Sequence, residues 1–174
     1  MRTTGGDGRG PEIWIRGPVG ATTPAPPYDP PAARVPGPRR CSWVAVHGGA
    51  GATTLAAVYG GHDCGRDWPG PDVPASVLLV ARTHAGGLAA AARAVDAFRH
   101  GEAPHGLGLD AVVLVADAPG RLPRPLAVRM RCLEEVVAVH RVPWVPAWRL
   151  GDLTGPPPRG TGPLVRLAGA TGVR

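Results

Sequence analysis

A glycine-rich turn between an apolar run and a helical run has the residue types needed to bind an anion. The turn reads HGGAG over residues 47–51 and two threonines follow it. Glycines let successive backbone N–H groups point into one hollow at a helix start, where the dipole also favours negative charge. In such loops a threonine hydroxyl holds Mg²⁺, a role that falls here to Thr53. The predicted phosphate-binding residues are His47, Gly48, Gly49, Ala50, Gly51, Ala52, Thr53 and Thr54.

Further polar residues follow the later apolar runs. Arg82 and His84 come after VLLVA, and Asp117 and Arg121 come after AVVLVA. Arg82 or His84 could contact a phosphate, and Asp117 could complete a magnesium site with Thr53. Each of these residues could equally cap a turn and stay solvated. We predict that Arg82, His84, Asp117 and Arg121 form the rim of a pocket.

Two tryptophans stand among prolines in the segment RVPWVPAWR, at positions 144 and 148. Trp is favoured at interface hot spots and can stack on a base, so Trp144 and Trp148 are candidates for binding a partner. The alternative is that one packs in the core and the other is partly exposed. The sequence leaves both interpretations open.

The elements that must position these residues alternate between strand and helix. Apolar runs predict strands at 42–46, 77–81 and 111–116, helical periods occur at 53–59, 88–99 and 126–140, and an edge-like strand is expected at 142–145. This alternation predicts right-handed crossovers and a mostly parallel sheet. Ligands of such sheets bind beyond the carboxyl ends of the strands, where the residues above gather. The expected fold is a small three-layer α/β domain with a mostly parallel sheet.

Composition divides the chain into a domain and two tails. The 26 glycines and 22 prolines among 174 residues are concentrated at the two ends. Because proline fixes φ and lacks a donor, we expect residues 1–40 to form a disordered tail. The domain is expected over 41–150. Residues 151–174 are expected to form a flexible tail with at most a short strand around 164–167.

Charge and cysteine content bear on the class of protein. The net charge of +6 comes from arginine alone, without any lysine, and its excess lies in the tails. A basic face is therefore not indicated, and nucleic acid is an unlikely partner. The three cysteines are too far apart for a disulfide framework or a zinc motif. Without an apolar run long enough to cross a bilayer or a signal-like segment, we expect a cytoplasmic protein with no membrane span.

The segment VHGGAGATTLA resembles the deviant Walker A motif of the ParA/MinD family, G-K-G-G-x-G-K-T-T. Gly48, Gly49, Gly51 and both threonines agree with it. Val46 stands at the first glycine, while His47 and Ala52 stand at the two lysines of the motif. An ammonium near a phosphate oxygen contributes on the order of 4 kcal/mol at an effective dielectric of about 20. The resemblance therefore implies a nucleotide site, for ATP or another nucleotide with Mg²⁺, that lacks its catalytic cations.

The same resemblance gives Asp117 two further interpretations beside a turn cap. It could be a Walker B aspartate, or the strand before it could match a later strand beside the nucleotide base. Residues 43–151 are also similar to short actinobacterial proteins that share HGGAG-x-[ST]-TL, VADAPGRLPRPL and RVPWVPAWRLG. That resemblance implies a P-loop-like fold and a connection with transfer or secretion ATPases.

The expected function is a nucleotide- or anion-binding regulatory or accessory component without efficient hydrolysis. One alternative is a weak NTPase in which Arg82, Arg121 or a partner's arginine replaces the lysine. Another is a scaffold that binds no nucleotide and docks on a larger ATPase of a transfer or secretion system through Trp144 and Trp148.

Overall fold

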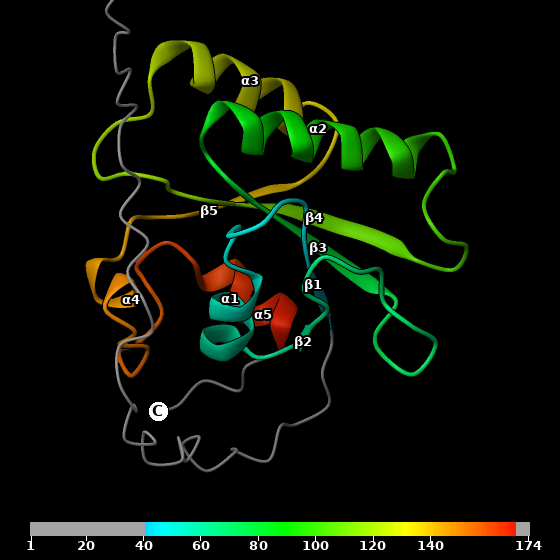
Figure 1. Ribbon diagram of the computed structural model, residues 1–174, viewed down its shortest axis with the longest axis horizontal. Coiled ribbons are helices and arrows are strands. Elements are labelled where there is room, and N and C mark those ends of the chain that lie inside the picture. The colour runs from blue at the N-terminus through cyan, green and yellow to red at the C-terminus, as the bar shows by residue number, and fades with distance from the viewer. Residues whose placement is uncertain (1–40, 170–174) are drawn as a thin grey trace, which may run out of the picture. The chain divides into compact units, whose positions relative to one another are not determined.

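The computed structural model describes residues 41–169, which contain one five-stranded sheet (Figure 1). The strands are β1 Ser42–Ala45, β2 His62–Asp63, β3 Ser76–Arg82, β4 Gly108–Val115 and β5 Val139–Val142. Their order in the sheet is β2-β1-β3-β4-β5, and every neighbouring pair is parallel. The predicted α/β class is confirmed, and the sheet is parallel throughout.

Helices cover both faces of the sheet. They are α1 Ala52–Tyr59, α2 Ala85–Arg99, α3 Arg124–Glu134, α4 Pro146–Arg149 and α5 Gly162–Ala168. In Figure 1, α2 and α3 lie above the sheet and α1 and α5 lie below it, which gives three layers. Among the helices of residues 41–169, none is long and apolar enough to cross a membrane.

The core consists of two clusters separated by the sheet. Leu78, Val80 and Val113 pack on the side of α1 and α5. Their chain neighbours Leu79 and Val112 pack on the side of α2 and α3. Because successive side chains of a strand point to opposite faces, a strand covered on both faces must be apolar at nearly every position. The continuous runs VLLVA and AVVLV meet this requirement.

The structure corrects the predicted end of the helix at 126–140. Helix α3 ends at Glu134, and residues 139–142 form β5 instead. The strand expected at 142–145 therefore begins three residues early, although it lies at the edge of the sheet as expected. The segment 136–139 reads VVAV, and β-branched side chains lose rotamer freedom in a helix. Pairing with Val112–Val115 provides the ladder that this segment joins.

The structure also corrects the C-terminal segment, where the strand expected around 164–167 is the helix α5. Leu164 and Ala168 are buried in the core on the side of α1. The Tyr59 hydroxyl donates a hydrogen bond to the Thr161 hydroxyl at 2.8 Å, also in a buried position. Part of the segment 151–174 thus packs against the domain. The tail expected at 1–40 and residues 170–174 lie outside the described residues.

The stability of the domain should depend on pH through His140 of β5. Burial, and then the positive charge of Arg166 on α5, lower the pKa of His140 below its usual 6.5. The unfolded chain then binds this proton more readily, so the free energy of unfolding should fall as the pH drops below about 6.5. Urea denaturation between pH 5 and 8 should show a shallower fall for His140→Gln. An unchanged slope in that variant would contradict the prediction.

Candidate functional site

The segment 47–54 is a tight turn that leads from β1 into α1. The Ala50 N–H donates to the His47 carbonyl at 3.3 Å. Gly49 and Gly51 have φ values of +71° and +107°, in the left-handed region that favours glycine. Gly51 is also the N-cap of α1, and its carbonyl accepts from the Leu55 N–H at 3.0 Å. The turn is therefore curled at the start of a helix, on the carboxyl edge of the sheet.

The first amides of α1 are not used inside the protein. No side chain caps the helix, and no residue within 41–169 accepts a hydrogen bond from the N–H of Ala52, Thr53 or Thr54. The first N–H groups of any helix lack an internal partner and carry the positive end of its dipole. Thr53 is exposed beside them. An anion at this position would meet donors that have no other acceptor in the described protein.

His47 fastens the turn to the neighbouring strand. Its Nε2 lies 3.0 Å from the backbone nitrogen of Arg82, and its Nδ1 lies 2.9 Å from the Gly48 carbonyl oxygen. The Arg82 N–H can only donate, so Nε2 accepts and Nδ1 carries the proton. This is the neutral form of the imidazole. His47 therefore brings no positive charge to the turn, although it stands at a lysine position of the Walker A motif.

Arg82 supplies the positive charge beside the turn. Its Nε donates to the Gly49 carbonyl at 3.2 Å, and its Nη1 donates to the Ala116 carbonyl at 2.9 Å. Burial, and then the charge of Arg149, lower the pKa of Arg82, while Asp117 opposes the shift. The guanidinium thus bridges the turn after β1 and the loop after β4. Of the predicted rim residues, Arg82 is the one whose side chain hydrogen-bonds to the turn, and the ring of His84 lies beside the ring of His47, with centroids 5.1 Å apart.

Two further rim residues follow β3 and β4, and of these His84 takes the capping role that the sequence left open. His84 is the N-cap of α2, and its Nδ1 accepts from the Gly87 N–H at 3.0 Å. The Asp117 N–H donates to the Thr83 hydroxyl at 3.0 Å. The turn also approaches the end of β4, because a Cβ at Gly51 would lie 3.9 Å from Val115 Cγ2, two residues before Asp117. No hydrogen bond among the described residues joins Thr53 to Asp117.

A cavity of about 770 Å³ opens at the same edge of the sheet. It is bounded by the loop after β4, the end of β5 and residues 159–160. Four of the predicted rim and partner residues line it, namely His84, Asp117, Arg121 and Trp144. None of the residues 47–54 does. The turn and the cavity are therefore two neighbouring regions, and Arg82 lies at the boundary between them.

The two tryptophans are placed differently. Trp144 is half-buried at the cavity, and the Arg149 guanidinium stacks on its ring at 4.4 Å from the centroid. Trp148 packs against the core cluster on the side of α1 and α5. Packing of one ring in the core was one of the two interpretations that the sequence allowed. Trp144 is the one that remains accessible from the cavity.

Sequence reasoning missed three arginines of this region. Arg141 and Arg159 line the cavity, and Arg149 stacks on Trp144. Arg141 lies between the helix predicted at 126–140 and the strand predicted at 142–145. Arg159 lay in the segment expected to be a flexible tail. The sequence analysis did not predict that residues 159–168 pack against the domain. The signal for this packing in the sequence was the apolar pair Leu164 and Ala168, which the structure buries.

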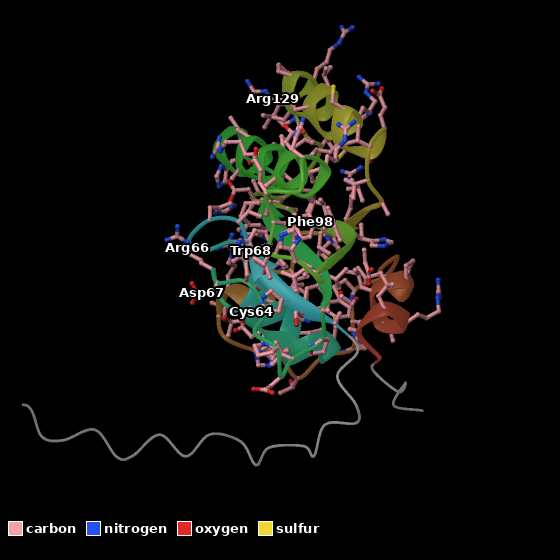
Figure 2. The ribbon with its side chains drawn as sticks, turned by 90° about the vertical axis from the view of Figure 1, so that its right-hand side faces the viewer. Cys64, Arg66, Asp67, Trp68, Phe98 and Arg129 are labelled. Atoms are coloured by element: carbon pink, nitrogen blue, oxygen red, sulfur yellow. The ribbon has the colours of Figure 1, made fainter. Side chains whose placement is uncertain are left out.

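The connection after β2 begins at this edge, where the Gly65 carbonyl accepts from the Ala45 N–H at 2.7 Å, and it reaches α2 through Trp68. Trp68 packs edge-to-face on Phe98 of α2, with ring centroids 5.3 Å apart. Figure 2 shows Trp68 beside Phe98, with the Arg66 and Asp67 side chains pointing away from the domain. None of these residues lines the cavity. This connection therefore covers part of α2 and contributes none of these residues to the cavity.

The sequence matches no protein-family model, no curated protein and no solved structure.

Proposed function

We propose that this chain is a degenerate P-loop-like domain that binds an anion, such as a nucleotide phosphate, at the turn 47–54. Its role would be regulatory or accessory, without efficient hydrolysis. The observation that carries the proposal is the position of the Arg82 guanidinium, 3.2 Å from the Gly49 carbonyl and beside the uncapped start of α1. Free amides and a fixed cation in one place are the chemistry that a phosphate group requires.

The lack of an ammonium group at the turn argues against efficient phosphoryl transfer. The side chain of Ala52, at the position of the conserved lysine, is buried in the core. His47 is engaged by Arg82 in its neutral form. Catalysis of phosphoryl transfer depends on positioned cations that neutralise the developing charge. Arg82 already donates to two carbonyls, which hold its guanidinium in place. It is therefore better suited to binding a phosphate group than to moving with a phosphoryl group during transfer.

The weak NTPase and the scaffold are the competing proposals. A weak NTPase would use Arg82, Arg121 or an arginine of a partner for the missing lysine, with Mg²⁺ at Thr53. Steady phosphate release that disappears in Thr53→Ala would favour it. A scaffold would dock on a larger ATPase of a transfer or secretion system, and it would bind no nucleotide. Trp148 is partly buried against the core cluster, so Trp144 at the cavity would be the main aromatic contact of such a scaffold.

Thermal unfolding in the presence of pyrophosphate or ATP with Mg²⁺ tests the proposal. A ligand that binds only the native state at ten times its Kd adds about 1.4 kcal/mol to the free energy of unfolding. That should raise the Tm by several degrees in a domain of this size. Sodium sulfate at matched ionic strength controls for general salt effects. A Tm unaffected by millimolar concentrations of either ligand would favour the scaffold.

A negative charge placed in the turn should weaken this binding. A Cβ at Gly48 would meet nothing within 4 Å, and Gly48 does not have a positive φ, so a side chain fits there. We expect Gly48→Glu to weaken pyrophosphate binding by about tenfold through repulsion at short range. Gly48→Gln has nearly the same shape without the charge and should bind almost as well as the natural chain. Equal losses in the two variants, measured by titration calorimetry, would contradict a phosphate at the turn.

A further inference from the structure

The cavity beside the turn has an apolar floor. Its walls include Leu114 at the end of β4, Val142 at the end of β5 and Leu126 at the start of α3. Its volume of about 770 Å³ is within the range of pockets that enclose small molecules, roughly 300–1,000 Å³. A concavity with such walls removes part of the surface of a bound ligand from water. It therefore favours a molecule with an apolar body.

The edge of the cavity is positively charged. Arg121, Arg141 and Arg159 line it from three separate segments, against Asp117 as the one carboxylate of the lining. Within residues 41–169 the ion pair that the structure contains joins Arg99 and Asp96 elsewhere, so these three guanidiniums have no carboxylate within 4 Å. Guanidinium groups bind carboxylates, sulfonates and phosphates through paired N–H donors. Three uncompensated ones around one opening favour an anionic ligand group.

Trp144 adds a flat surface to this arrangement. Its ring is half-buried, lines the cavity and is held by the stacked guanidinium of Arg149. A fixed indole ring contributes stacking area at little entropic cost. The apolar floor, the aromatic wall and the charged edge thus select different parts of the same molecule.

We propose that this cavity binds a small organic anion, a molecule with a flat apolar body and one carboxylate, sulfonate or phosphate group. The body lies on the apolar floor beside Trp144, and the anionic group meets Arg121, Arg141 and Arg159 at the opening. This site is distinct from the turn, because none of the residues 47–54 lines it, but the two are neighbours, since His84 of the lining has its ring 5.1 Å from the ring of His47.

The fluorescent sulfonate 1-anilinonaphthalene-8-sulfonate matches this description and serves as the probe. We expect saturable binding of one molecule, and about a tenfold weaker affinity for each guanidinium removed in Arg141→Gln and Arg159→Gln. Both arginines are exposed, so the variants should keep their circular dichroism spectrum and Tm. The uncharged N-phenyl-1-naphthylamine should bind more weakly than the sulfonate and should not respond to the two substitutions. Competition by 1-naphthoate and by 1-naphthyl phosphate then separates a carboxylate ligand from a phosphate ligand.

The chain offers a matched control in the groove between α2 and α3. This second concavity, of about 490 Å³, is also apolar and also contains two arginines, Arg99 and Arg129. Arg99→Gln with Arg129→Gln removes the same charge from the protein and should leave probe binding unchanged. The proposal is overturned if this pair weakens binding as much as the cavity pair does. It is also overturned if the cavity pair has no effect, or if neither naphthyl acid displaces the probe.

Discussion

Gly87→Ala is expected to destabilise the domain by about 3 kcal/mol. A Cβ at this position would lie 2.2 Å from the Arg82 carbonyl oxygen and 3.0 Å from His47 Nε2. The first of these contacts is with a backbone atom, which cannot rotate away from a clash as a flexible side chain can. Relief requires the start of α2 to move away from the end of β3, and overpacking of a buried site typically costs about 1–3 kcal/mol or more. Urea denaturation followed by circular dichroism measures the change.

The preceding glycine provides the control for this experiment. A Cβ at Gly86 would approach only the His84 ring, at 3.5 Å, which is an ordinary contact. Alanine is favoured over glycine inside a helix by roughly 1 kcal/mol, so Gly86→Ala should be neutral or slightly stabilising. Similar losses in the two variants would show that α2 does not approach Arg82 as closely as described. A loss confined to Gly87→Ala would support the packing that places His47 and Arg82 at the turn.

Gly87→Ala also bears on the proposed anion site. The Cβ would press on the Arg82 carbonyl and on His47 Nε2, which accepts the hydrogen bond from the Arg82 N–H. That bond fixes the turn to β3, and the Arg82 side chain extends from the same residue to the Gly49 carbonyl. Any Gly87→Ala protein that still folds should therefore bind pyrophosphate less tightly. Gly86→Ala should bind it as the natural chain does.

The central strands and the turn could be predicted because local sequence decides them. Val77–Ala81 is a continuous apolar run with turn residues on both sides, and it allows no other regular element of that length. The glycines at 49 and 51 adopt the positive φ values that a tight strand-to-helix turn requires. Since parallel strands end at one edge, the gathering of Arg82, His84 and Asp117 there followed from the alternation of elements.

Elements that depend on tertiary contacts could not be predicted in the same way. The two-residue strand β2 exists only because it pairs with Ser42 and Trp43 of β1. Val139 continues an apolar pattern that is also compatible with a helix. Its pairing with Val112 on β4 places it in a strand instead. The roles within the site were equally hidden. No spacing in the sequence indicates that His47 accepts from Arg82, or that Arg159 returns to the cavity.

Leu164→Ala is expected to destabilise the domain by about 2–5 kcal/mol, the usual range for a buried leucine. Leu164 is fully buried in the cluster that α5 shares with α1 and β1. The reasons are the lost transfer free energy of the side chain and the void that it leaves between α5 and the sheet. The same helix follows Thr161, whose hydroxyl accepts from Tyr59, so weaker packing of α5 should also loosen that contact. Thermal and urea unfolding measure the effect.

A leucine elsewhere in the C-terminal third supplies the comparison. Leu150 is 86% exposed, so Leu150→Ala removes the same atoms from a position where they are already in water. Its free energy of unfolding should stay within about 0.5 kcal/mol of the natural chain. If residues 151–174 were a flexible tail, Leu164→Ala would be as mild as Leu150→Ala. A large difference between the two substitutions would instead support the packing of α5 in the core. It would also support the position of Arg159 at the cavity.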